Sequence, residues 1–217
     1  MYRQTFKIFA ESNLNDYLHQ ASANIDSRIR RESDNYILNV NETEFVDYLL
    51  GELSIDEIII DFENAFVTTY EKNIPAERFP RGFYVYAGKS YPTDVVVYHL
   101  PFSGDEQLLR MVPNSRLLWS VPVYIEDGYI CFEIIAFRDD SAVIEREAND
   151  NIGNIKKQWQ NVLNDIRGFN NTLQQRILES FRGRKQHLLK KGDFLAALSV
   201  PVKKKYDLPE TFAVPPI

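Results

Sequence analysis

The sequence predicts an α+β fold, with a mainly antiparallel sheet preceded by N-terminal helices and followed by a C-terminal helical pair. Between residues 56 and 137, short runs rich in β-branched and aromatic residues alternate with turn residues, as in antiparallel sheets. After Asn151, apolar residues recur at steps of three and four, which is the spacing of a helix. Composition agrees, because 44% of the 217 residues are apolar and 13% are aromatic, enough for a substantial packed core.

Two helices are expected before the sheet. The first follows Asn13, a residue type that caps helix N-termini. Its apolar stripe comprises Leu14, Tyr17, Leu18, Ala21, Ile25 and Ile29. The second follows Asn41, with Glu44 at the capping-box position. Its stripe comprises Phe45, Leu49 and Leu53, so both helices are predicted to bury one face.

Six runs have the composition of strands. They cover residues 56–62, 65–70, 82–88, 94–100, 117–125 and 128–137. Glu126, Asp127 and Gly128 predict a tight hairpin between the last two runs, because Asp-Gly tolerates the positive φ angles of such turns. Residues 103–112 are long enough for about two helical turns, which would interrupt the sheet.

A heptad-like seam begins after Asn151. It comprises Ile152, Ile155, Trp159, Val162, Ile166, Phe169 and Leu173. Gly168 and the asparagines after it favour a stop, and Thr172 with Gln175 matches a capping box, so we expect two helices joined at residues 168–171. One long helix is the alternative, because the apolar register is unbroken. The seam needs cover, either from this chain, which we favour, or from a second copy in a homodimer.

The expected organisation is an α+β body over residues 1–141, the helical pair over 142–198 and a Pro-punctuated linker over 199–217. A cut at Asn151 separates a body of net charge −13 from a tail of net charge +7. Such asymmetry can mark a surface for a charged partner, although helices are often Lys-rich simply to remain soluble.

The basic residues of the tail are the candidate nucleic-acid-binding residues. They are Arg182, Arg184, Lys185, Lys190 and Lys191, followed by Lys203, Lys204 and Lys205. Several cations beside phosphates release counterions, which gives strongly salt-dependent binding without base recognition. The other interpretation is a solvated helix, or cations paired with the acidic body.

The last third of the chain resembles a region of a group of bacterial proteins. The similar segments are "NIGNI", "GFNNTL", "RGRKQHLL", "FLAALSVPVKKK" and "DLPETFAVP". In that group a β-rich N-terminal part leads through paired helices and a Pro-containing connector into a nuclease-like domain of the PD-(D/E)XK type. The resemblance implies that this chain is the N-terminal part of a larger protein, and it places no nuclease residue in the chain.

The residues themselves assign no catalytic group. A PD-(D/E)XK site needs two carboxylates to hold a metal and a lysine two residues after the second carboxylate. Asp94 could serve as the first carboxylate and Glu133 as the second, but Ile135 stands where the lysine is required. Residues 88–90 resemble the end of a P-loop, but Phe83 stands where its first glycine is required.

Metal and thiol chemistry are equally unsupported. Four acids lie near the first predicted strand: Asp56, Glu57, Asp61 and Glu63. They could bind a hard cation only if alternate residues shared a face, and their pattern is equally typical of acids that simply face the solvent. His19, His99 and His187 lack metal-ligand spacing, and Cys131 fits a small buried side chain. No metal residue and no cofactor is assigned.

A single cysteine excludes a disulfide scaffold, and no apolar run approaches the ~20 residues of a membrane span. The sequence therefore predicts a soluble cytoplasmic protein without a membrane partner. The leading function is a non-catalytic recognition or regulatory N-terminal domain of a larger bacterial protein, in one version a nuclease-type effector, with its downstream domain or another protein as partner. The alternatives are a sequence-independent nucleic-acid-binding module that uses the basic C-terminal helix, and a metal-dependent hydrolase with acids in the sheet.

Overall fold

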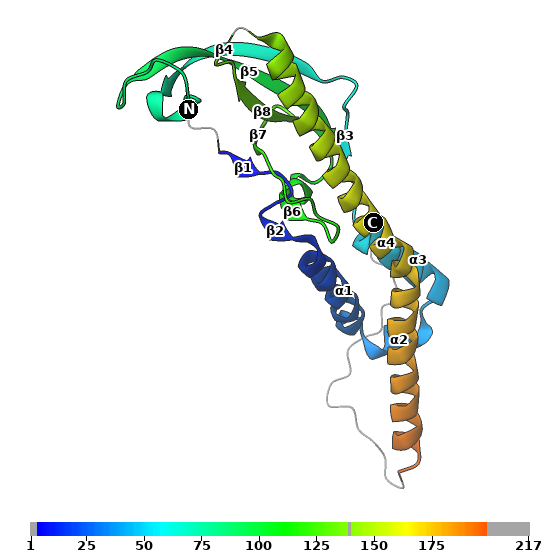
Figure 1. Ribbon diagram of the computed structural model, residues 1–217. Coiled ribbons are helices and arrows are strands. Elements are labelled where there is room, and N and C mark those ends of the chain that lie inside the picture. The colour runs from blue at the N-terminus through cyan, green and yellow to red at the C-terminus, as the bar shows by residue number, and fades with distance from the viewer. Residues whose placement is uncertain (1–3, 139, 199–217) are drawn as a thin grey trace. The chain divides into compact units, whose positions relative to one another are not determined.

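The structure is a computed structural model that describes residues 4–138 and 140–198 (Figure 1). The chain is α+β, with a curled antiparallel sheet and a long C-terminal helix. Two compact units are distinguished: unit 1 holds the residues up to Tyr17 together with Asp56–Arg167, and unit 2 holds Leu18–Ile55 and the chain from Gly168 onward.

The sheet of unit 1 has six strands in the order β1-β7-β8-β5-β3, with β4 also paired to β5, and all its pairings are antiparallel. The strands are β1 (Phe6–Lys7), β3 (Ile59–Ile60), β4 (Phe66–Pro75), β5 (Ser90–Ser103), β7 (Pro122–Glu126) and β8 (Tyr129–Ile135). A separate parallel pair is formed by β2 (Ser12–Asn13) and β6 (Met111–Val112). Two 3₁₀ helices, η1 (Ala76–Arg78) and η2 (Glu106–Arg110), lie in the connections.

Side chains pack on both faces of this sheet. The residues buried together on one face are Val95, Val97, Tyr124 and Cys131. On the other face Tyr98 stacks on Phe132, with ring centroids 5.1 Å apart. Figure 1 shows the first turns of α4 (Ser141–Ala196) lying across the sheet. Burial raises the pKa of Tyr98, and the nearby Glu145 of α4 raises it further.

The predicted hairpin is confirmed, because Asp127 (φ 50°) and Gly128 (φ 82°) form a tight turn between β7 and β8. The predicted strand at 82–88 is wrong. Gly82 and Gly88 both have positive φ, and the backbone between them bonds locally: Val85 N–H donates to the Phe83 carbonyl at 3.1 Å. The alternating aromatic residues have the composition of a strand, but a glycine turn at each end makes this segment a loop.

Unit 2 is helical in its described part, apart from its connections. It contains α1 from Leu18 onward (the whole helix is Leu14–Arg31), α2 (Asp34–Asn39), α3 (Glu42–Leu53) and α4 from Gly168 onward. Its core comprises Ile25, Ile29, Ile37, Phe45, Val46, Leu49, Phe169, Leu173, Ile177, Phe181 and Leu188. The predicted cap at Asn41 is present, since its side chain accepts the Thr43 N–H at 2.9 Å. The short α2, capped by Ser33, was not predicted.

The expected helical pair over residues 142–198 is wrong, because α4 continues through residues 168–171 as one helix. The residues that favoured a turn have other partners. Asn170 donates to the Ile55 carbonyl at 2.9 Å and accepts the Ile55 N–H at 3.1 Å, and the Thr172 hydroxyl donates to the Phe169 carbonyl at 2.9 Å. These polar groups are satisfied without a helix end. The predicted linker at 199–217 lies outside the described residues.

The seam of α4 is covered by the chain itself. Ile155, Val162 and Ile166 are fully buried, and Trp159 donates its indole N–H to the Ile58 carbonyl at 2.8 Å. A homodimer through the seam stays a prediction. Within the described residues, the helices are too short or too polar to cross a membrane.

Candidate functional site

The five candidate nucleic-acid-binding residues have different environments, and Arg182 is engaged within the chain. Its guanidinium holds the Glu42 carboxylate with Nη2 to Oε1 at 2.6 Å and Nε to Oε2 at 3.2 Å. This hydrogen-bonded pair lowers the pKa of Glu42 and raises the pKa of Arg182. A phosphate would have to compete with a carboxylate already bound at two points.

Arg184 is the more deeply placed of the two arginines, with its side chain 16% exposed. It donates to the backbone carbonyls of Ile29 and Glu32, and to Asp34 Oδ1 at 3.2 Å. The last carbonyls of a helix lack the usual partner four residues later, and a cation there also opposes the negative end of the helix dipole. The Ile29 carbonyl, in the last turn of α1, otherwise accepts the Glu32 N–H at 3.3 Å. Arg184 therefore caps α1.

The three lysines lie further along α4. Lys185 Nζ is 5.6 Å from the centre of the Phe181 ring, whereas Lys190 and Lys191 are exposed. Lys191 borders an open cavity of about 580 Å³. The charged residues of its lining are Asp26, Arg30, Asp34, Arg184 and Lys191, and His187 lines it as well. Cations accessible to a ligand are thus found near the end of α4, among acids.

A second group of polar residues lies on the sheet of unit 1. His99 Nε2 is 2.9 Å from the Thr68 hydroxyl, and His99 Nδ1 is 3.2 Å from Cys131 Sγ. The His99 ring also stacks on Phe66 at 4.6 Å. The spacing is that of a nucleophile and its base, but Cys131 is fully buried and His99 is 9% exposed. The geometry gives a substrate no access to the sulfur, so these groups tie β4, β5 and β8 together.

Glu133 is held beside this group. It accepts a hydrogen bond from the Tyr70 hydroxyl at 2.8 Å and another from Lys72 Nζ at 2.8 Å. Burial, and then the bond to Glu133, raise the pKa of Tyr70, and that same carboxylate raises the pKa of Lys72. A lysine thus does reach Glu133, but it comes from β4, which β5 separates from β8.

The register separates the two halves of the nuclease-like pattern. Glu133 lies opposite Val97, and Asp94 precedes Val97 by three residues on the same strand. Because successive side chains alternate between faces, Asp94 points away from the face that carries Glu133. The two carboxylates do not share a metal site. Among the described residues, no group of three or more His, Cys, Asp or Glu is arranged to hold a metal ion.

Other motif residues also have local roles. Arg167 binds Glu57 through two hydrogen bonds of 2.6 and 2.7 Å, which lowers the pKa of Glu57. Asp61 accepts bonds from the residues that follow it in an Asx turn. In the P-loop-like segment the Gly88 N–H donates to Glu77 Oε1 at 2.8 Å, so a carboxylate already occupies a donor that a phosphate would need.

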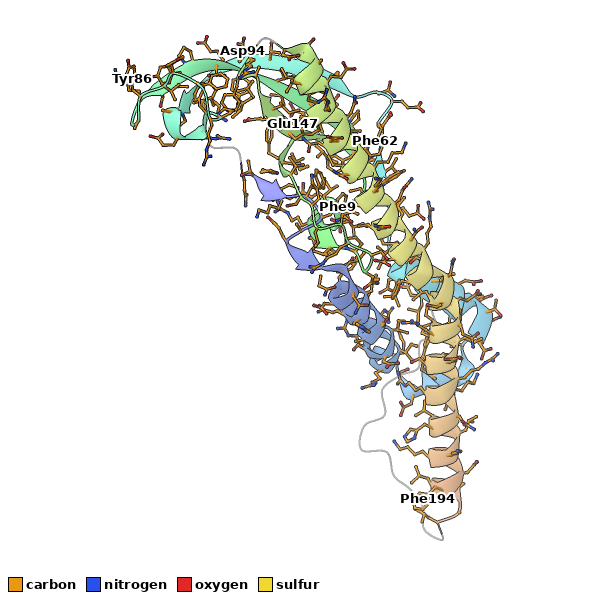
Figure 2. All side chains as sticks on the ribbon, viewed as in Figure 1. Phe9, Phe62, Tyr86, Asp94, Glu147 and Phe194 are labelled. Carbon is orange, nitrogen blue, oxygen red and sulfur yellow. The ribbon has the colours of Figure 1, made fainter. Side chains whose placement is uncertain are left out.

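Sequence reasoning missed the apolar cavity of unit 1. It has a volume of about 380 Å³ and lies where the end of β8, the segment after η1 and the start of α4 meet. Its lining comprises Pro80, Phe83, Ile134, Ile135, Ala136, Phe137, Arg138, Asp140, Val143, Ile144 and Glu147. Figure 2 shows Glu147 on α4, beside the sheet.

The segment over residues 79–91, here called the aromatic segment, forms one wall of this cavity. Phe79 packs its ring against Phe137 at 4.9 Å and against Tyr91 at 5.7 Å. Tyr84 and Tyr86 contribute nothing to that packing, because they are 103% and 73% exposed. Figure 2 shows Tyr86 at the outer end of the segment. Lys89 Nζ lies 5.5 Å from the centre of the Tyr86 ring, and both tyrosines remain exposed above the packed base of the segment.

Charged groups surround the mouth of the cavity. The guanidinium carbon of Arg138 lies 5.2 Å from the centre of the Phe83 ring. Asp140 caps α4, because its Oδ1 accepts the Ala142 N–H at 3.1 Å. Within the described residues Glu147 makes no hydrogen bond or ion pair. The cavity therefore combines apolar walls with one cation and one uncommitted carboxylate.

The sequence held one signal for this site. The run "GFYVYAG" between glycines, after Pro80, is unusually aromatic, but strand propensity explained it equally well. That residues 134–147 lie beside the aromatic segment becomes apparent only from the fold. Comparisons with protein-family models, curated proteins and solved structures found no match, so the geometry of the cavity and of the aromatic segment is what bears on function.

Proposed function

We propose that this chain is a non-catalytic recognition module, and that it serves as the N-terminal domain of a larger bacterial protein of the kind its last third resembles. One observation carries the proposal: an apolar cavity of about 380 Å³ adjoins a segment that exposes Tyr84 and Tyr86. Pockets of this size that are mainly apolar, with a few polar groups at the mouth, are typical of binding sites.

The exposed tyrosines support recognition of a partner. Tyr and Trp are enriched among the residues that dominate binding energy, because they bury a large rigid surface and offer a polar tip. The base of the segment is already ordered: Tyr86 N–H donates to the Tyr91 hydroxyl at 2.9 Å, and Gly88 N–H donates to Glu77. A preorganised segment loses less conformational entropy when it binds.

Photo-crosslinking tests the proposal. A photoreactive phenylalanine is placed at Tyr84, and as a control at Leu118, another exposed residue of unit 1 that is 93% exposed. We expect a discrete crosslinked product in the protein's own cells from position 84, weakened by Tyr86→Ser, and none from position 118. Equal products from both positions, or none from either, would contradict partner recognition. Metal-dependent phosphodiester hydrolysis that Glu133→Gln abolishes would contradict the non-catalytic assignment.

Nucleic-acid binding is the second candidate, and the exposure of Lys190 and Lys191 near the end of α4, where Lys191 borders a cavity, favours it. We expect Lys190→Gln with Lys191→Gln to make the slope of log affinity against log salt shallower, by about 0.9 for each duplex phosphate that the variant no longer neutralises. Arg182→Gln is the control, since Arg182 already binds Glu42. A protein that binds no labelled duplex at low salt would eliminate this candidate.

A further inference from the structure

We propose that the 380 Å³ cavity of unit 1 binds a free apolar α-amino acid, with the side chain inside the cavity, the carboxylate on Arg138 and the ammonium on Glu147. The inference rests on the proposed recognition function and names the ligand class of the same site.

The interior of the cavity suits an apolar side chain. Its walls include Phe83, Ile134, Phe137, Val143 and Ile144, and its volume lies at the small end of the range for ligand pockets, roughly 300–1,000 Å³. Val143 is 53% exposed although it faces this cavity. A bound side chain would cover this exposed apolar surface, which favours binding in proportion to the area removed from water.

Arg138 is placed to receive a carboxylate. Its guanidinium carbon lies 5.2 Å from the centre of the Phe83 ring, and within the described residues it makes no ion pair. A guanidinium over an aromatic face keeps N–H donors at its edge, and those donors match the two oxygens of a carboxylate.

Glu147 is placed to receive the ammonium. It follows Val143 and Ile144 by four and three residues on α4, so all three lie on one face of the helix. Asp140, the other acid of the lining, already accepts N–H bonds at the helix start. Glu147 is therefore the carboxylate that remains for a cation.

The charges favour a zwitterion over an ion of one sign. An apolar anion would satisfy Arg138 but would meet Glu147 and Asp140, whereas an apolar cation would satisfy Glu147 but would meet Arg138. An apolar α-amino acid carries both charges next to its side chain and so offers a partner to each of the two groups that line the cavity. A residue inside a peptide carries neither charge, so the site favours the free amino acid.

Isothermal titration with four probes tests the inference. The probes are L-leucine, L-phenylalanine, L-phenylalanine amide, which lacks the carboxylate, and N-acetyl-L-phenylalanine, which lacks the ammonium. We expect at least one free amino acid to bind, and each blocked form of phenylalanine to bind about tenfold more weakly or worse than phenylalanine itself, as expected when one charge-assisted hydrogen bond is removed.

Variants assign each end of the ligand. Arg138→Gln should remove the preference for phenylalanine over its amide, and Glu147→Gln should remove the preference over the N-acetyl form. Arg146→Gln and Glu145→Gln are matched controls on the same helix that do not line the cavity, and they should bind as the unsubstituted protein does. Melting curves check that every variant is folded.

Two results would overturn the inference: no binding of either free amino acid at millimolar concentration, or equal binding of all three phenylalanine forms. The outcome is separable from that of the crosslinking experiment. Amino-acid binding without a crosslink at position 84 would contradict recognition of a macromolecular partner and support the amino-acid site. A crosslink without amino-acid binding would support partner recognition and contradict the amino-acid site.

Discussion

Arg184→Ala is expected to destabilise the protein strongly, although the residue lies in the most basic part of the chain. The substitution removes the donor to the Ile29 and Glu32 carbonyls at the end of α1, in an environment where the Arg184 side chain is 16% exposed. Hydrogen bonds from charged groups contribute about 1.5–3 kcal/mol each, and water can replace part of them at the edge of the core. We therefore expect the free energy of unfolding to fall by about 2–3 kcal/mol.

Urea denaturation followed by circular dichroism measures this change. With a slope of about 2–3 kcal/mol per molar for a chain of this size, the midpoint should fall by roughly 1 M. Arg184→Lys should recover only part of the stability, because an ammonium cannot reproduce the guanidinium fork. Arg182→Ala is the control and should shift the midpoint little, since its partner Glu42 is a surface carboxylate. Equal midpoints for Arg184→Ala and Arg182→Ala would refute the capping role.

Two further predictions concern bonds at helix α4. Asn170→Ala should lower stability by about 1–3 kcal/mol in the same urea assay, despite the higher helix propensity of Ala, because the Ile55 N–H and carbonyl both lose their side-chain partner; a more stable variant would contradict this. The hydrogen bond and charge of Arg167 lower the pKa of Glu57 in the folded protein. The ionised Glu57 therefore contributes fully to the free energy of unfolding above its ordinary pKa, and this contribution disappears as the pH falls through the lowered pKa of the folded protein. Urea midpoints of the unsubstituted protein and of Glu57→Gln should therefore differ at neutral pH and converge in acid, and a difference that does not change with pH would be inconsistent with the ion pair.

Local chemistry explains which parts of the fold the sequence could predict. Asn41 and the Asp127–Gly128 turn were predictable because each depends on neighbours only a few residues away. Asn170 misled for the opposite reason: its partner Ile55 lies 115 residues earlier in the chain. Patterns within one segment do not reveal such a partner, so a residue type common in turns predicts a helix end that the structure does not have.

The same distinction holds for the candidate site. The separation of Asp94 from Glu133 follows from strand register, and one residue of slip would have reversed it. The cavity likewise depends on the meeting of Phe83 with Phe137 and Ile144, which lie more than 50 residues later in the chain. Neither could be read from residue spacing alone.

Hydrogen exchange tests the central claim most directly. The protein isolated from its own cells together with its bound partner is compared with the same chain purified alone, and exchange is followed peptide by peptide. Recognition through unit 1 predicts that added protection is concentrated in residues 79–91 and 134–147, around the cavity and the exposed tyrosines. Unchanged exchange in those two regions, with protection instead confined to the exposed lysines at the end of α4, would contradict it.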